Sequence, residues 1–331
     1  MEKTDKDVNQ NKHQKYRMVA LDLDGTLLGA DHQLSNDTVE YMRYLHKKGF
    51  VVSIATGRSA ACTFDQVSHL QLSYPNTIHS DGLPVICSNG ACGIQIKVNE
   101  GINENENTNE IVRHNGRHSG MVDLNIQHVF YDPLSIKTTQ KALEISVELG
   151  HLIQYYVGNE IFANPKTESN EAFMKKYSRL TGKTQIICDD SFEKALEKGA
   201  PSKLLVVCGE DKVDEVYARM LSELHGLAHV VRGSPAWFVE ILNPNVCKGN
   251  GLKQMAKSLN VNMNEIIAFG DGDNDLEFLT FAGKGIAMKN ARENVKLVAD
   301  HVCEWTNVED GVIRTLQKFE KDGLLYFPSD E

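Results

Sequence analysis

An apolar run near the N-terminus ends in two aspartates, and this feature constrains the fold most. Residues 16–23 (YRMVALDL) are typical of a buried strand in a parallel sheet. Asp22 and Asp24 stand at its end, followed by Gly25 and Thr26. Open α/β sheets bind their ligands at the carboxyl ends of their strands, and glycine permits an abrupt turn there. An Asx turn that merely closes a strand needs one aspartate, so the pair predicts a functional site.

Strands and helices alternate after this first run. Ser35 is a suitable N-cap for a helix that ends before Gly49, and residues 50–55 then form a second apolar run. A second helix is expected over 59–70 and a third strand over 84–88. This alternation predicts right-handed crossovers and an α/β fold, a doubly wound parallel sheet.

The middle of the chain has a different texture. Residues 99–110 (NEGINENENTNE) are a low-complexity stretch, expected to be a solvated hairpin tip or an insertion of undefined role. Alternating strands mixed with helices follow up to residue 244 and predict an α+β region. The strand–helix pattern of the N-terminal part resumes at Lys248. We therefore predict a disordered tail over 1–15, a core formed by 16–91 with 245–331, and an inserted cap over 92–244.

A second acidic cluster follows the apolar residues 265–269. It reads Gly-Asp-Gly-Asp-Asn-Asp and places Asp271, Asp273 and Asp275 near the same sheet edge as the first pair. So many carboxylates repel one another unless a cation lies among them, and oxygen ligands with a phosphate partner favour Mg²⁺ over zinc. A calcium loop is excluded because Leu276 and Ala282 occupy the positions that require glycine and glutamate.

Two further segments could bind an anion at that edge. Thr56, Gly57 and Arg58 end the second strand and open a helix, whose N–H groups can face a phosphate. Lys248 begins another helix and supplies a positive charge. Each alone is more often a helix cap or a solvated charge, and it is their order along the chain that makes them candidates. Lys203 opens a strand and could reach the cleft from the cap, although a solvated lysine is the default expectation.

Composition narrows the functional classes. The chain of 331 residues carries 35 Lys and Arg against 45 Asp and Glu, a formal charge of −10, which argues against nucleic acid or an anionic membrane as partner. No apolar run approaches the roughly 18 residues of a membrane-spanning helix. The polar N-terminus lacks a secretory signal, and the seven cysteines include no C-x-x-C pair. We therefore expect a cytoplasmic protein, whose oligomeric state the sequence does not indicate.

The ordered motifs resemble those of the haloacid dehalogenase-like superfamily of phosphohydrolases, and most closely its Cof-type group of subclass IIB. That group carries a large cap between its second and third motifs. The resemblance covers nearly the whole ordered chain, in the segments DLDGTLL (22–28), IATGR (54–58), SNGA (88–91), VCKGNGL (246–252), IAFGDGDNDLEFL (267–279), GIAMKNA (285–291) and EDGV (309–312).

The resemblance implies a role for each motif residue. Asp22 would be the nucleophile that forms an aspartyl-phosphate, and Asp24 the general acid and then the general base. Mg²⁺ would be bound by the Asp22 carboxylate, the main-chain carbonyl of Asp24 and the Asp271 carboxylate, with Asp275 steadying the cluster. The groups implied for the phosphoryl oxygens are Thr56, Gly57, Lys248 and Asn274. Arg58, and Asn89 at the junction of the predicted core and cap, are candidates for contact with the leaving group. Asp273 is expected to face solvent.

These residues together predict a Mg²⁺-dependent phosphomonoesterase that acts on a small phosphorylated metabolite, such as a sugar phosphate. Two alternatives remain open at this point. A phosphotransferase similar to phosphomannomutase would pass the phosphoryl group to a sugar hydroxyl in place of water. A non-catalytic regulator that binds a phosphorylated metabolite is the other, although no catalytic position of the motif set is missing.

Overall fold

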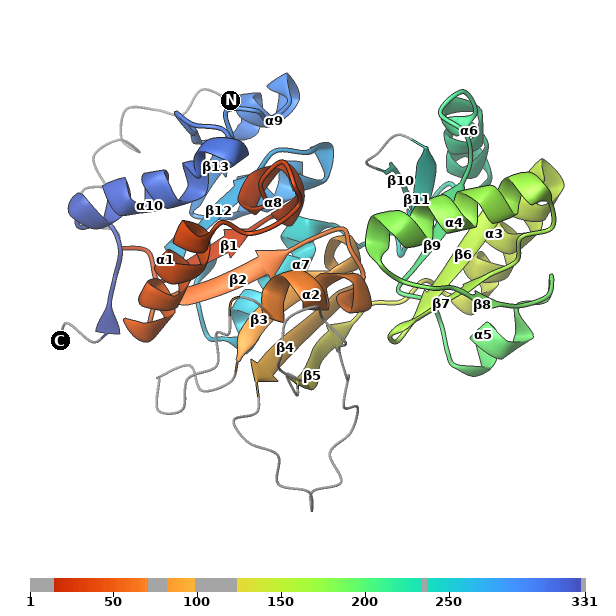
Figure 1. Cartoon of the computed structure of the whole chain (residues 1–331), viewed down its shortest axis with the longest axis horizontal. Coiled ribbons are helices and arrows are strands. Elements are labelled where there is room, and N and C mark those ends of the chain that lie inside the picture. The colour runs from red at the N-terminus through yellow and green to blue at the C-terminus, as the bar shows by residue number, and fades with distance from the viewer. Residues whose placement is uncertain (1–14, 69, 71–81, 99–123, 234–236, 329–331) are drawn as a thin grey trace, which may run out of the picture.

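Two sheets organise the part of the chain that the structure describes (Figure 1). The computed structural model describes residues 15–68, 70, 82–98, 124–233 and 237–328. The first sheet has eight strands, and the second has six. This arrangement confirms the predicted α/β class with a second, inserted α+β region.

The first sheet has the order β14-β13-β12-β1-β2-β3-β4-β5. From β14 to β3 neighbouring strands are parallel, and β4 and β5 extend the sheet in antiparallel pairing. Its strands are β1 (Met18–Leu21), β2 (Val51–Ala55), β3 (Leu83–Cys87), β4 (Cys92–Val98), β5 (Leu124–Tyr131), β12 (Ile266–Gly270), β13 (Lys284–Ala287) and β14 (His301–Val302).

Helices cover both faces of this sheet. In Figure 1, α1 and α10 lie in front of the strands and α7 lies behind them. Burial on both faces explains why β1, β2 and β12 are continuous apolar runs. The helices of this part are α1 (Asn36–Lys47), α2 (Ala60–Ser68), α7 (Lys248–Ser258), α8 (Leu276–Phe281), α9 (Glu293–Val298) and α10 (Gly311–Lys321).

Helix α1 illustrates how local sequence sets the ends of an element. The Ser35 hydroxyl accepts a hydrogen bond from the backbone N–H of Thr38, which satisfies one of the unpaired donors of the first turn. Met42 and Leu45 are buried against the sheet. Gly49 then adopts a φ of +83°, a left-handed conformation that ends the helix and leads into β2. The predicted cap and stop of this helix are confirmed.

The second sheet has the order β10-β11-β9-β6-β7-β8 and is antiparallel except for the β7–β8 pair. Apolar residues on one face pack with those of α3 and α6, and those on the other face pack with α4. Its elements are α3 (Ile136–Leu149), β6 (Leu152–Val157), β7 (Glu160–Ala163), α4 (Glu168–Thr181), β8 (Ile186–Ile187), α5 (Glu193–Glu197), β9 (Lys203–Val207), α6 (Val213–Glu223), β10 (His229–Arg232) and β11 (Phe238–Leu242).

The boundary between the two parts differs from the predicted one. Residues 92–98 were expected to open the cap, but β4 pairs with β3 along its length and β5 pairs with β4. The first sheet therefore extends to Tyr131, and the second sheet begins at Leu152. The stretch 99–110 and residues 1–14 of the predicted tail lie outside the described residues. Among helices of the described part, none is long and apolar enough to cross a membrane.

Candidate active site

The two aspartate motifs meet at the carboxyl ends of β1 and β12. The backbone N–H of Asp22 donates to the Phe269 carbonyl at 3.1 Å, which ties the two strand ends together. Gly25 has a φ of +80°, and a Cβ at that position would lie 2.3 Å from Asp271 Oδ2. The Thr26 hydroxyl donates to Asp271 Oδ1 at 3.1 Å. Glycine is therefore required at position 25 both for the turn and for the close approach of Asp271.

Lys248 lies buried between two of the carboxylates. Its Nζ donates to Asp22 Oδ1 at 2.5 Å and to Asp275 Oδ1 at 2.7 Å, and the residue is 1% exposed. Asp275 Oδ2 accepts from the backbone N–H groups of Asp271 and Gly272 at 3.0 and 2.9 Å. Both oxygens of Asp275 thus accept hydrogen bonds, Oδ1 from Lys248 and Oδ2 from the backbone of the loop that contains Asp271.

The carboxylates outnumber the ammonium at this point. One oxygen each from Asp22, Asp271 and Asp275 lies within 4.8 Å of the others, and three negative charges against one positive charge leave an excess of two. Burial and then the neighbouring carboxylates raise the pKa of Asp22 well above its ordinary value, against the opposing effect of Lys248. Burial and the Asp275 charge raise the pKa of Asp271 to about 6. A divalent cation with oxygen ligands fits this excess, and the side chains of Asp22 and Asp271 could hold it.

Asp24 lies in a different electrostatic environment. It accepts two hydrogen bonds from Arg58, at 2.8 Å from Nε and 2.6 Å from Nη2, and lies 3.2 Å from His32 Nδ1. Burial acts to raise the pKa of Asp24, but Arg58 and His32 together hold it below its ordinary value. The pKa values of Asp22 and Asp24 therefore differ, but in the direction opposite to the implied roles. The implied nucleophile, Asp22, has the raised pKa, and the implied acid, Asp24, has the lowered one.

The remaining motif residues gather beside this cluster. Thr56 is buried at the end of β2, and its Oγ1 accepts from the N–H of Arg58 at 3.1 Å. Asn89 has a left-handed φ of +53° and its N–H donates to the Thr56 carbonyl. Asn89 Oδ1 accepts from Asn274 Nδ2 at 2.8 Å, and Asn89 Nδ2 donates to Glu240 Oε2 at 2.8 Å. Asn89 was expected to contact a leaving group, but here both ends of its amide bind protein side chains.

Three residues near the site, Lys203, Glu240 and His32, were not predicted as part of it. Lys203 was expected to be solvated, and this is wrong: it is 2% exposed and paired with Glu240 at 2.9 Å. His32 contacts Asp24 from a turn that has no motif. Asp273 is half exposed, and it pairs with Arg292 and accepts from Asn294. The sequence did contain a signal for the Lys203–Glu240 pair: each residue is a single charge in an otherwise apolar strand. Because buried charges require partners, each residue could have been predicted to pair with an opposite charge.

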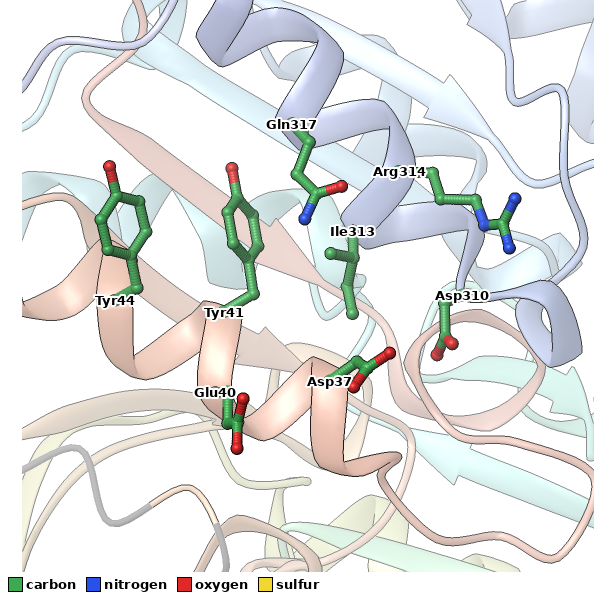
Figure 2. A pocket seen from close by; sticks show the side chains of 8 residues that line it. All are labelled: Asp37, Glu40, Tyr41, Tyr44, Asp310, Ile313, Arg314 and Gln317. Atoms are coloured by element: carbon green, nitrogen blue, oxygen red, sulfur yellow. The ribbon is translucent and has the colours of Figure 1, made fainter.

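A separate groove of about 690 Å³ lies between α1 and α10 (Figure 2). Tyr41 and Tyr44 extend side by side from α1, and their hydroxyls donate to the two carboxylate oxygens of Glu320. Ile313 and Gln317 of α10 lie close to Tyr41, and Arg314 of the same helix lies farther along the groove, near Asp310. Asp310, from the segment 309–312, also lines the groove, but none of the predicted catalytic, phosphate-binding or metal-binding residues does, so the groove is distinct from the cluster at the ends of β1 and β12.

Comparison with known proteins identifies the family of the chain. The profile of haloacid dehalogenase-like hydrolases matches residues 19–119 and 98–316. Phosphatase YwpJ of Bacillus subtilis is 30% identical over 309 residues, covering 91% of this chain and 99% of the relative. The 5-amino-6-(5-phospho-D-ribitylamino)uracil phosphatase YitU of the same species is 26% identical, covering 91% of this chain and 97% of the relative.

Solved structures share the fold. A haloacid dehalogenase-like hydrolase from Bacteroides thetaiotaomicron has a TM-score of 0.71 at 24% identity and covers 92% of this chain and 100% of that chain. The subclass IIB sugar phosphatase BT4131 has a TM-score of 0.68 at 22% identity, and the match covers 92% of this chain and 99% of that chain. The predicted family and the predicted enzyme class, a phosphatase, are confirmed. The chain belongs to the haloacid dehalogenase-like hydrolase family.

Proposed function

We propose that the enzyme is a Mg²⁺-dependent phosphomonoesterase that hydrolyses a small phosphorylated metabolite through an aspartyl-phosphate on Asp22. The observation that carries this proposal is the position of Asp22. Its carboxylate is buried, contacts the Lys248 ammonium, and lies within 4.8 Å of the Asp271 and Asp275 carboxylates. A carboxylate at the centre of such a cluster can act as a nucleophile toward phosphorus when a cation offsets the surrounding charge.

The chemistry requires two displacements. An Asp22 oxygen attacks phosphorus, the bond from phosphorus to the ester oxygen breaks, and Asp24 gives its proton to the departing alcohol. Asp24 then takes a proton from a water molecule whose oxygen attacks phosphorus, which releases inorganic phosphate and regenerates Asp22. Thr56, Lys248 and Asn274 would bind the phosphoryl oxygens. Positioning and charge neutralisation of this kind dominate phosphoryl transfer.

Mg²⁺ would be held by the carboxylates of Asp22 and Asp271 and by the main-chain carbonyl of Asp24. When bound, it would supply positive charge that keeps Asp22 ionised and neutralises the phosphoryl oxygens. Asp275 would not need to ligate it directly, because both of its oxygens already accept hydrogen bonds from Lys248 and the backbone.

Arg58 must change partner before Asp24 can act as an acid. While Nε and Nη2 of Arg58 donate to Asp24, the pKa of that carboxyl stays low and its protonation is unfavourable. A substrate that draws the guanidinium toward its own phosphate or leaving group would release Asp24 to hold a proton. In this proposal Arg58 contributes to the reaction only once substrate is bound.

The small size of the substrate is supported by the second sheet, which packs against this side of the core through Asn89 and Gly57. A cover of this kind excludes bulk water and macromolecular substrates. Two relatives with named substrates, the YitU phosphatase and the BT4131 sugar phosphatase, act on small phosphorylated molecules. A phosphotransferase remains the second candidate, and release of phosphate without any acceptor distinguishes the two.

Turnover of an aryl phosphate with and without Mg²⁺ tests the proposal. Asp22→Asn should lower kcat by at least about a thousandfold, because the nucleophile is lost while the shape is kept. Asp273→Asn is the matched control, since it removes a half-exposed carboxylate from the same loop and should retain activity. Full activity in the Asp22→Asn variant would rule out the aspartyl-phosphate mechanism. Specificity constants across a panel of phosphorylated metabolites would then identify the substrate.

A further inference from the structure

A buried ion pair joins the second sheet to the core. Lys203 on β9 and Glu240 on β11 are 2% and 6% exposed, and Lys203 Nζ lies 2.9 Å from Glu240 Oε1. The ammonium also lies 5.1 Å from the centre of the Tyr156 ring. Removing two charges from water is costly, and a buried pair is often no more stabilising than apolar side chains of the same size. Stability alone therefore gives little reason for this pair.

The pair contacts both segments that we assign to phosphate binding. Lys203 Nζ donates to the carbonyl of Gly57 at 2.9 Å, next to Thr56. Glu240 Oε2 accepts from Asn89 Nδ2, and Asn89 Oδ1 accepts from Asn274 Nδ2, each at 2.8 Å. A continuous set of hydrogen bonds thus runs from one ion pair in the second sheet to two loops of the first.

The direction of these hydrogen bonds is set by Glu240. An ionised carboxylate only accepts, and Lys203 already donates to its other oxygen. Asn89 must therefore turn its Nδ2 toward Glu240, which leaves its Oδ1 to face Asn274. Asn274 must in turn present Nδ2, and the second N–H of that nitrogen is the one that can donate to a phosphoryl oxygen.

The parts of this network have little room to rearrange. A Cβ at Gly57 would lie 3.0 Å from Asn89 Oδ1, so the backbone of the Thr56–Gly57 segment is packed directly against the Asn89 amide. The N–H of Asn89 donates to the Thr56 carbonyl at 3.0 Å. Movement of Lys203 or Glu240 with the second sheet would therefore be transmitted to both loops.

We propose that Lys203 and Glu240 are positioning residues that orient the Asn274 amide and the Thr56–Gly57 segment for the phosphoryl group. Phosphate affinity then depends on how the second sheet sits on the core. This inference rests on the proposed function, because it takes these two loops as the phosphate-binding groups. It adds a role for two side chains that are outside the motif set and do not contact the reacting atoms.

The test measures the dissociation constant for inorganic phosphate in the presence of Mg²⁺, together with kcat and KM for an aryl phosphate. Glu240→Gln replaces one of the two accepting carboxylate oxygens by an NH₂ group, which donates. The amides of Asn89 and Asn274 then lose their fixed orientation. We expect phosphate binding to weaken about tenfold and KM to rise more than kcat falls. Tyr155→Phe is the matched control: it removes a buried hydroxyl of the second sheet that donates to Gly199. It should leave phosphate affinity within about twofold.

A second variant protects the test against misfolding. Asn89→Gly removes the link between Glu240 and Asn274 while tolerating the left-handed backbone at that position, and the Lys203–Glu240 pair stays intact. It should also weaken phosphate binding about tenfold. If folded Glu240→Gln and Asn89→Gly proteins bind phosphate as tightly as the wild type, this inference is overturned but the proposed function is not. The same holds if Tyr155→Phe weakens phosphate binding as much as they do. A wild-type protein that neither binds phosphate nor hydrolyses an ester would overturn the proposed function as well.

Discussion

Two buried lysines occupy opposite sides of the candidate site, and their surroundings differ in charge balance. Lys248, at the start of α7, contacts Asp22 and Asp275 and has Asp271 close by. Lys203, on β9, contacts one carboxylate, that of Glu240, and one carbonyl. The first group carries an excess of two negative charges, whereas the second is neutral as a pair.

This difference in charge balance indicates that the group around Lys248 needs a further cation and that the group around Lys203 does not. Around Lys248 the carboxyl pKa values of Asp22 and Asp271 are raised, first by burial and then by neighbouring carboxylates, which means that full ionisation is unfavourable there. Such a cluster can be stabilised by a bound cation, and it is suited to chemistry in which negative charge moves. Around Lys203 each charge already has a partner, which suits a group that holds other side chains in place.

Lys248→Met should have the largest effect. It leaves the carboxylates of Asp22 and Asp275 buried without their ammonium, and breaking a buried pair in this way costs about 3–5 kcal/mol. We expect a loss of that size in the free energy of unfolding, from urea denaturation at pH 7.5 without metal. We also expect kcat/KM for an aryl phosphate to fall at least about a hundredfold. Lys318→Met, which removes an exposed partner of Glu304 in the same core, is the control.

Addition of Mg²⁺ should have the next largest effect and should depend on pH. The pKa of Asp271 is about 6 in the folded, metal-free protein, above its unfolded value. Its ionisation therefore opposes folding above about pH 6, and this penalty disappears as the pH falls below about 4. A cation that binds the ionised cluster at a hundred times its Kd would stabilise by about 2.7 kcal/mol.

We expect the rise in Tm on adding Mg²⁺ to be larger at pH 8 than at pH 5, where protons compete for the same oxygens. Thermal unfolding at both pH values measures it. In an Asp271→Asn variant the Mg²⁺ response should be lost. An equal rise in Tm at both pH values, or an unchanged rise in the variant, would contradict the assignment of the cation to this cluster.

The first of these groups could be predicted from the sequence, because its residues follow apolar strands. Asp22 and Asp271 each stand directly after a run that could only be a buried strand, and parallel strands bring such residues to one edge. Thr56 and Lys248 follow the same rule at a strand end and a helix start. The order of these motifs therefore predicted the fold of the core and that Asp22, Lys248 and Asp271 lie together, whereas their chemical roles stay predictions.

The second group could not be predicted, because antiparallel pairing between distant segments determines it. Lys203 faces Glu240 only because β9 pairs with β11, and the sequence gives no register for that pair. The boundary of the second part differed for a similar reason, since β4 and β5 are alternating strands that could have joined either sheet. The ion pairing of Asp24 with Arg58 depends on the path of two loops, which periodicity does not describe.

The smallest expected effect is the difference in stability recovered when both charges of each pair are removed. Lys203→Met alone leaves the buried Glu240 carboxylate without its cation and, among the described residues, with Asn89 as its side-chain partner, so it should be strongly destabilising. Adding Glu240→Gln removes the stranded charge and keeps an acceptor for Asn89, and we expect about 2 kcal/mol of the lost stability to return. Adding Asp22→Asn to Lys248→Met should restore less, because Asp271 and Asp275 still face each other without a cation. Urea denaturation of both pairs of variants at pH 7.5 measures the two recoveries. Equal recoveries would mean that the two lysines differ in position but not in charge balance.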